Sequence, residues 1–187
     1  MESRVESELV RKCRTGESRF FEPLVRAYEA EAIRIARALL GDLDAARDAA
    51  QEAFVKAYRA LATFDDSRRF RPWFLQILRN HCRDMARHRK VVRNIEVPAG
   101  GLGGRYENAA SFDRTADQRE ARDILWKGLS VIEDAHREVL VMKELEGLSY
   151  AEIAAQLAIP EGTVASRLYH ARRALRDALV DMGVEYP

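Results

Sequence analysis

Apolar residues in the first half of the chain recur at every third or fourth position, which is the spacing of amphipathic helices. Gly41 is expected to end a first such helix, and Asp42 or Asp44 to cap a second one. The apolar stripes lie at Leu24, Tyr28, Ala32, Ile35 and Leu39 in the first helix, and at Ala46, Ala50, Phe54, Ala57 and Leu61 in the second. Each stripe would bury one face of its helix, so the pattern predicts a helical bundle.

A third long helix is predicted after the polar segment 64–69. Pro72 suits its first turn, where the missing N–H of proline has no helical partner to lose. At about 100° per residue, one side of this helix is apolar and the other is polar and basic. The apolar side holds Phe74, Ile77, Leu78, His81 and Met85, and the opposite side holds Gln76, Arg79, Asn80, Arg83, Arg87 and Lys90.

Helical periodicity stops between Asn94 and Gln118. Four glycines stand among the seven residues 98–104, a composition typical of flexible linkers. We find no strand-like alternation in the sequence. We therefore expect an all-α protein with a first helical domain over 1–92, a flexible linker over 93–118 and a second helical domain over 119–187.

The second domain contains a short helix, a turn and a longer helix. Ser149, with Glu152 three residues later, forms a capping box that predicts a helix start. Pro160 and Gly162 are expected to end this helix after about ten residues. The longer helix that follows has its apolar stripe at Val164, Leu168, Ala171, Leu175 and Leu179. This order is the layout of a helix-turn-helix unit.

The longer helix has a polar face suited to DNA. If its apolar stripe is buried, Ser166, Tyr169, His170 and Arg173 point outward. Residues 161–163 then lie at the exposed N-terminal end, the part of a recognition helix that contacts base edges in a major groove. Residues 163–176 contain four arginines and no acidic residue. An ordinary helical hairpin is the alternative interpretation of this pattern.

Charge is unevenly distributed along the chain, although its 31 basic and 30 acidic residues nearly cancel. Segment 68–93 contains nine basic residues and one acidic residue, Asp84. Such a segment suits a polyanion, for which nucleic acid is the commonest candidate, while a solvated helix face is the alternative. Because the predicted third helix gathers these cations on one face, we favour the polyanion.

Composition limits the class of protein further. With 33% charged and 47% hydrophobic residues, the chain is neither collagen-like nor wholly disordered. No apolar run approaches the roughly 18 residues of a membrane span, and the first residues do not resemble a signal peptide. Cys13 and Cys82 form no C-x-x-C pair, which favours a reduced protein of the cytoplasm.

Motifs for catalysis and for metal or nucleotide binding are missing from the sequence. It contains no Walker A, H-E-x-x-H or G-x-S-x-G pattern, and its glycine-rich segment does not fit the dinucleotide fingerprint. His81, Cys82 and His88 are close in sequence, but on a helix Cys82 points away from both histidines. We therefore expect no enzymatic activity, no metal site and no cofactor.

Short strings along the chain carry a family resemblance. They are D-A-A-Q-E-A-F at 48–54, F-x-x-W-F-x-x-I-x-x-N at 70–80 with Asp84 and Arg87 after it, and G-T-V-x-S-R-L at 162–168. With the two helical domains and the linker, they resemble an extracytoplasmic-function sigma factor, the short form of the sigma-70 family with only regions 2 and 4. The resemblance spans about residues 20–90 and 119–180.

The resemblance implies that the first domain, region 2, binds the clamp of core RNA polymerase and the minus-ten element of a promoter. The second helix would face the clamp. The acidic face of this helix suits a basic partner; the alternative interpretation is that the face is simply solvated. Arg47 and Ala49 depart from the family pattern, which has an acid and a bulky apolar residue there. The candidate polymerase-binding residues are Asp44, Asp48, Gln51 and Glu52.

Residues 63–71 would form the loop that captures an unstacked base of the non-template strand. Phe64 and Phe70 would stack on bases, and Asn80 would form hydrogen bonds with them. Trp73 would wedge against the first open base pair, or alternatively belong to the core. The candidate phosphate contacts are Arg79, Arg83, Arg87 and Lys90.

Region 4 would read the minus-thirty-five element as duplex DNA. Ala165 departs from the basic residue that many members have at this position. The linker would tether two weakly binding domains across two promoter elements. Members are commonly held by an anti-sigma factor, which is therefore an expected partner besides core RNA polymerase and promoter DNA. The candidate contacts are Thr163, Ser166, Arg167, His170 and Arg173.

Two other functions compete with a promoter-specificity subunit. One is a stand-alone helix-turn-helix regulator that binds duplex DNA without polymerase; the cationic third helix and the aromatic loop before it argue against this. The other is a sigma-like decoy that binds an anti-sigma factor but not DNA; the arginines of residues 163–176 argue against that.

Overall fold

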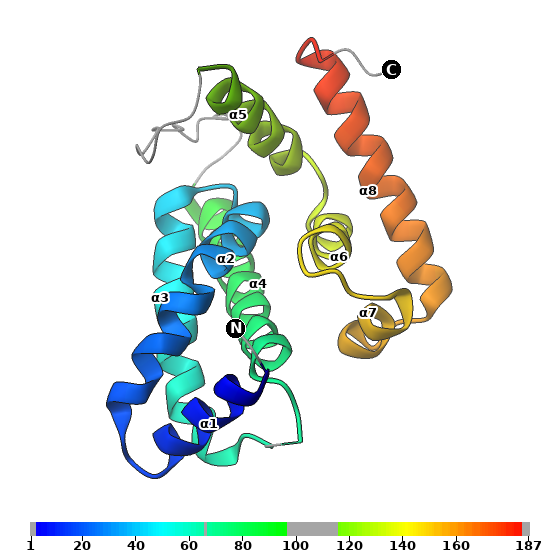
Figure 1. Ribbon diagram of the computed structural model, residues 1–187. Helices are drawn as coiled ribbons and strands as arrows, with labels where there is room; N and C mark the ends of the chain where they lie inside the picture. The colour runs from blue at the N-terminus through cyan, green and yellow to red at the C-terminus, as the bar shows by residue number, and fades with distance from the viewer. Residues whose placement is uncertain (1–2, 66, 97–115, 185–187) are drawn as a thin grey trace. The chain divides into compact units, whose positions relative to one another are not determined.

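Every element that the computed structural model describes is helical (Figure 1). The description covers residues 3–65, 67–96 and 116–184, and the chain divides into two compact units. The all-α prediction is therefore confirmed. Within the described residues, no helix is long and apolar enough to cross a membrane.

The first unit is a bundle of long helices joined by short connections. Gly41 follows α2 with φ +77°, and Asp42 caps α3 by accepting a hydrogen bond of 2.7 Å from the Ala45 amide. Asp42 rather than Asp44 is thus the cap, and Pro72 lies in the first turn of α4 as expected. The elements are α1 (Ser3–Arg14), η1 (Ser18–Phe21), α2 (Glu22–Leu40), α3 (Leu43–Ala60), η2 (Leu61–Thr63) and α4 (Phe70–Glu96).

Aromatic rings fill the core of this unit. The rings of Phe54 and Phe74 stack with centroids 4.3 Å apart, and Phe70 stacks on Phe74 at 5.8 Å. Tyr28 packs against Phe70 at 5.9 Å. The predicted stripes of α2 and α3 are buried throughout, so these two predictions are confirmed.

The buried face of α4 differs from the prediction. Leu75 and Cys82 are buried, while His81 is only partly buried. Arg79, which was expected on the exposed cationic face, is 2% exposed. Because α4 packs against both α3 and α1, a wider arc of its surface is covered than one apolar stripe. The aliphatic part of an arginine side chain can lie in such a covered arc.

The second unit packs its longest helix against three others. It consists of α5 (Ala116–Ser130), α6 (Asp134–Glu144), α7 (Tyr150–Leu157) and α8 (Glu161–Asp181), and α8 contacts the other three. Val164, Leu168 and Ala171 of the predicted stripe are buried, whereas Leu175 and Leu179 are partly exposed. Gly128 allows a close approach of α5 to α8, since a Cβ there would lie 3.0 Å from Leu175 Cδ1.

The predicted linker falls mostly on residues 97–115, outside the described residues. At its two ends, α4 continues to Glu96 and α5 begins at Ala116, so helical structure reaches into the expected segment 93–118. The domain limits at residues 92 and 119 stay predictions.

The turn between α7 and α8 begins at Ala158. The Ser149 hydroxyl accepts from the Glu152 amide at 3.2 Å, and the Ser149 amide donates to Glu152 at 2.8 Å, so the capping box is confirmed. Helix α7 ends where Ala158 takes a left-handed conformation, with φ 53° and ψ 46°. Pro160 caps α8, and Gly162 lies inside α8. The short helix therefore ends before Pro160, as expected, but its end is at Ala158, and Gly162 belongs to α8 rather than to the break.

Candidate nucleic-acid and polymerase interfaces

The outer face of α8 presents polar and basic side chains. Ser166, Tyr169, His170 and Arg173 are exposed, as the sequence predicted, and Thr163 and Arg167 are partly exposed. The structure therefore brings all five candidate minus-thirty-five residues to the surface of one helix. An arginine-bearing helix face of this kind can donate hydrogen bonds to base edges and phosphates.

Contacts within the second unit divide the basic residues of α8 by role. Arg172 donates to Glu144 of α6 at 2.7 Å, and this hydrogen bond raises the pKa of Arg172. Arg173 lies 3.8 Å from Asp177 on α8 itself, an exposed and therefore weak pair. His170 stacks on His136 of α6 with ring centroids 5.6 Å apart. Arg172 thus joins α8 to α6, while Arg173 faces solvent.

The exposed face of α4 carries most of the cations expected to contact DNA. Asn80, Arg87 and Lys90 are exposed, and Arg83 donates to Asn80 Oδ1 at 3.2 Å. Arg87 lies 3.6 Å from Asp84. Because Arg79 is buried, the structure does not place it with the other four.

A local hydrogen bond links Asp65 and Ser67 in the loop before α4. Asp65 accepts a hydrogen bond of 2.9 Å from the Ser67 amide, and hydrogen bonding from Ser67 lowers the pKa of Asp65. Arg68 and Arg69 are exposed beside it. The loop therefore presents positive charge next to the α4 face. At the start of α4, Arg71 is fixed by two hydrogen bonds to Glu31, of 3.1 and 2.6 Å.

The aromatic residues expected to stack on bases are mostly interior. Phe70 is 1% exposed and Phe64 is 5% exposed. Trp73 is partly exposed and lies 4.7 Å from the Phe64 ring and 5.6 Å from the Phe70 ring. As surface stacking residues, Phe64 and Phe70 are thus both corrected to buried residues. The Phe70 ring completes the aromatic core at the start of α4.

The acidic face of α3 is accessible. Asp44, Asp48 and Gln51 are exposed, and Glu52 is partly exposed. Arg47 lies 3.2 Å from Asp44 and reduces the negative charge at the beginning of this face. The structure therefore places all four candidate polymerase-binding residues along one side of α3, with the strongest negative charge around Asp48 and Glu52.

A contact between α3 and α4 borders the acidic face. Lys56 and the Nδ1 atom of His81 lie 2.8 Å apart. Burial and the charge of Lys56 lower the pKa of His81, against smaller opposite effects of Glu52 and Asp84. His81 therefore acts as a neutral acceptor for the lysine at neutral pH.

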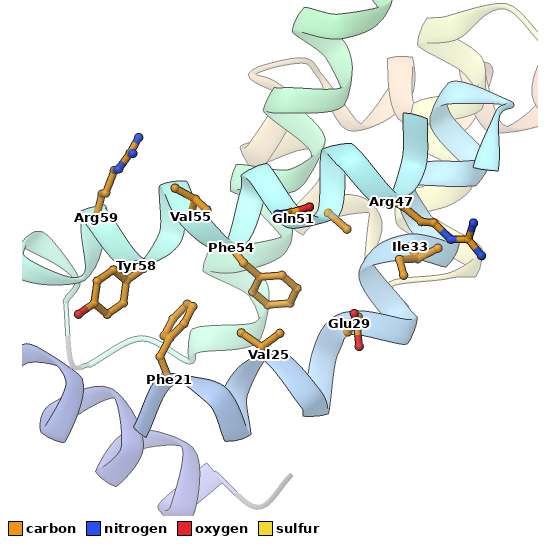
Figure 2. Close-up of a pocket in the computed structure, with 11 residues that line it drawn as sticks. Phe21, Val25, Glu29, Ile33, Arg47, Gln51, Phe54, Val55, Tyr58 and Arg59 are labelled. Atoms are coloured by element: carbon orange, nitrogen blue, oxygen red, sulfur yellow. The ribbon is translucent and has the colours of Figure 1, made fainter. Parts of the chain in front are cut away.

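A groove of about 720 Å³ lies between α2 and α3 and adjoins the acidic face at Gln51. Figure 2 shows Phe21 and Val25 facing Phe54 across it, with Gln51 at its edge. Sequence reasoning missed this groove. The signal was available in Val55 and Tyr58, two large apolar side chains outside the predicted apolar stripe of α3.

Metal and disulfide chemistry have no support in the described part of the chain. There, no group of three or more His, Cys, Asp and Glu residues is arranged to hold a metal ion. Cys13 and Cys82 are both free and buried.

Sequence profiles of known families match both units. The profile described as Sigma-70 region 2 matches residues 24–91, which include α3 and most of α2 and α4. The profile described as Sigma-70, region 4 matches residues 124–175, which include α7 and most of α8 of the helix-turn-helix unit. Together the two matches cover more than half of the chain.

Characterised relatives are similar over nearly the whole chain. The RNA polymerase sigma-H factor of Pseudomonas aeruginosa is 31% identical over 186 residues, covering 93% of each chain. The sigma factor SigW of Bacillus subtilis is 28% identical and covers 92% of this chain and 96% of its own. The sigma-E factor of Escherichia coli K12 is 31% identical and covers 89% of this chain and 90% of its own.

Solved structures agree in fold. CnrH, in its complex with the cytosolic domain of CnrY, is 28% identical with a TM-score of 0.66, covering 96% of this chain and 99% of its own. The sigma factor RpoE of Bartonella quintana, bound to the anti-sigma factor NepR, has a TM-score of 0.65 at 23% identity. The match covers 85% of this chain and 96% of RpoE. The chain therefore belongs to the sigma-70 family, as an extracytoplasmic-function sigma factor with regions 2 and 4.

Proposed function

We propose that this sigma factor binds core RNA polymerase through α3, contacts the opened minus-ten element through α4 and its preceding loop, and reads the minus-thirty-five element through α8. One observation carries the proposal: the acidic face of α3 and the basic faces of α4 and α8 are all exposed. Each face matches one partner by charge. Phosphodiester chemistry belongs to the polymerase in this scheme, and the chain itself is not an enzyme.

Region 4 provides duplex recognition through Thr163, Ser166, Arg167, His170 and Arg173. Arginine can donate two hydrogen bonds to guanine, and serine can bond to either base type. Arg173→Ala is expected to weaken binding of minus-thirty-five duplex by roughly ten- to a hundredfold, since a base-contacting arginine is worth about 1–3 kcal/mol. Association with core polymerase should remain intact.

Arg176→Ala is the matched control for Arg173→Ala. Arg176 is also exposed and lies 3.9 Å from the same Asp177, but it is not among the proposed contacts. Fluorescence anisotropy with a labelled duplex and a polymerase pull-down measure the two activities. Loss of both activities in the Arg173 variant, or equal effects of the two substitutions, would contradict this assignment.

Region 2 provides contacts to opened DNA through the exposed members of the α4 face. Arg83, Arg87 and Lys90 would neutralise phosphates, and Asn80 would bond to a base edge. Trp73 is partly exposed and remains the candidate wedge against the first open base pair. Phe64, Phe70 and Arg79 are left out of the proposed contacts, because all three side chains are buried.

The acidic face of α3 would bind a basic surface of the polymerase clamp. The groove between α2 and α3 adjoins this face and would take an apolar side chain of the same partner. Joint substitution of Asp48 and Glu52 by lysine is expected to reduce holoenzyme formation at least tenfold, because like charges then face each other across the interface. Native gel electrophoresis with core polymerase measures this.

The joint substitution Glu17→Lys and Glu22→Lys makes the same charge change elsewhere. Both residues are exposed and lie outside α3. This control should bind polymerase normally. Unchanged binding of the Asp48 and Glu52 variant would rule out an essential contact at this face, and failure of the unsubstituted chain to bind polymerase would favour a stand-alone regulator.

We further propose that an anti-sigma factor holds this protein inactive, and that it works in the cytoplasm, where the chromosome lies. Support comes from the complexes of the two structural relatives, of which RpoE is bound to an anti-sigma factor. Affinity purification of the tagged chain from its own cells, with and without added core polymerase, tests this. An inhibitor of this class should be displaced as polymerase binds.

A further inference from the structure

Two histidine rings stack where α6 meets α8, beside the proposed duplex-reading face. The centroid of the His136 ring on α6 lies 5.6 Å from that of the His170 ring on α8, and the two ring planes meet at 27°. His170 is one of the proposed minus-thirty-five contacts, whereas His136 is not among them. The stack therefore connects a proposed DNA contact to a second titratable ring on a neighbouring helix.

The two helices that carry these rings are fixed against each other. Helix α6 packs on α8, and Leu140 of α6 and Leu168 of α8 are both buried. Arg172 of α8 donates to Glu144 of α6 at 2.7 Å, which adds a polar contact between the same two helices. The relative position of the two rings is thus set by packed helices rather than by a loop.

Both rings can be reached from solvent. His170 is exposed, and the side chain of His136 is 30% exposed. The exposed ring of Tyr169 meets His170 edge to face, with centroids 5.4 Å apart. A phosphate bound at His170 would therefore lie near His136 as well, close enough for its charge to act on both imidazoles.

The nearest charged groups act in opposite directions on a proton bound by the stacked rings. Glu133 lies 3.2 Å from the Nδ1 atom of His136, a contact that becomes an ion pair when the imidazole is protonated. Arg167 and Arg173 stand about one turn before and after His170 on α8 and disfavour a further positive charge there. An arriving phosphate would add a negative charge and favour the proton.

Other charged groups of the neighbouring elements have partners of their own. Glu138 follows His136 by two positions and therefore does not face it on α6. Helix α5 meets α8 at Leu175, more than one turn beyond His170. The remaining pairs are Asp134 with Arg137, Lys143 with Tyr150, Ser149 with Glu152, and Arg173 with Asp177.

We propose that His136 is a positioning residue for His170, and that the two rings act as one pair that takes up a proton when a phosphate of the duplex approaches. The pair takes one proton rather than two, because like charges on stacked rings repel. Duplex affinity should then rise as pH falls toward the ordinary histidine pKa of about 6.5, since the complex binds the proton more tightly than the free chain. The inference rests on the proposed function, because it requires α8 to read duplex DNA.

The test measures binding of a labelled minus-thirty-five duplex to the full chain by anisotropy, between pH 8 and pH 6 at constant salt concentration. The affinity of the unsubstituted chain should increase about five- to tenfold over this range, as for one proton held beside a phosphate. His136→Gln should lose most of this increase, because glutamine is polar but does not titrate. His136→Arg should bind at pH 8 about as tightly as the unsubstituted chain does at pH 6, because arginine is charged throughout.

His88→Gln is the matched control, because His88 is an exposed histidine of α4 in the other unit. It should keep the full pH dependence. Equal pH dependence in His136→Gln and the unsubstituted chain would overturn the proposal, as would its loss in the control, or an arginine variant no tighter at pH 8 than the glutamine variant. The proposed function stands in these cases if Arg173→Ala still weakens binding. If the unsubstituted chain binds neither this duplex nor core polymerase at any pH, the proposed function itself fails.

Discussion

Ala158 is the strained residue of the helix-turn-helix unit, since its φ of 53° lies in the left-handed region. A residue with a Cβ atom is destabilised there by about 1–2 kcal/mol, whereas glycine is not. Glycine loses more backbone entropy on folding, by roughly 0.5–1 kcal/mol. Ala158→Gly should therefore stabilise the second unit by about 0.5–1 kcal/mol, measured by urea unfolding. The control Ala155→Gly, at an exposed position inside α7, should destabilise it by a similar amount.

His81 makes the stability of the first unit depend on pH. Its pKa is lowered in the folded state by burial and by Lys56, while Glu52 and Asp84 act in the opposite direction. The unfolded chain therefore binds more protons below the ordinary histidine pKa of about 6.5, and stability falls as pH drops below that value.

The melting temperature of the first unit should accordingly decrease between pH 7.5 and pH 5.5. His81→Gln should reduce this decrease, because glutamine can still accept from Lys56 but does not titrate in this range. Differential scanning calorimetry at several pH values measures both proteins. An equal pH dependence in the two proteins would show that His81 is not the responsible group.

At the scale of elements, the capping box fixes the first residue of α7, the short helix that precedes α8 in the helix-turn-helix unit. The Ser149 side chain satisfies the Glu152 amide, and hydrogen bonds from Ser149 lower the pKa of Glu152. Ser149→Ala should destabilise the second unit by about 1 kcal/mol, the usual loss for an N-cap. Ser166→Ala, at an exposed position on α8, should leave stability unchanged but weaken duplex binding.

The helices themselves could be predicted from the sequence, because their apolar spacing, caps and breaks are local signals. Asp42, Pro72 and Ser149 all act where the pattern placed them. The exact end of α7 could not be predicted this way, because an alanine with positive φ has no local sequence signature.

The candidate site was predictable only in part. The outward residues of α8 follow from a single buried stripe, so Ser166 and Arg173 were found. Arg79 and Phe70 were misplaced because α4 is covered from two sides, and helical periodicity assumes one. The stack of His136 on His170 and the groove between α2 and α3 each need two segments distant in sequence, which no local pattern connects.

At the scale of the whole molecule, the uneven charge predicts strong salt dependence of promoter binding. The logarithm of affinity should fall linearly with the logarithm of salt concentration, with a slope of about −0.9 per duplex phosphate and about −0.7 per single-strand phosphate neutralised. Arg87→Gln should reduce the slope by about 1. Arg26→Gln, an exposed cation of α2 paired with Glu22, should not change it.

This prediction is measured with holoenzyme and a promoter fragment over a range of salt concentrations. A flat plot would contradict the phosphate contacts proposed for α4. Equal slopes for the Arg87 variant and the unsubstituted protein would exclude a phosphate contact by Arg87, but not by the other residues of α4.

The sequence by itself determined that the chain is helical, that it has two helical parts and that a helix-turn-helix lies in the second, because spacing and capping are properties of neighbouring residues. It also located the cationic segment, since charge is additive along a helix face. Tertiary structure decided which cations reach solvent, as with Arg79, and which aromatic rings are buried rather than exposed, as with Phe64. The reason is physical: burial depends on how many elements cover a residue, and that number is fixed only when distant segments pack together.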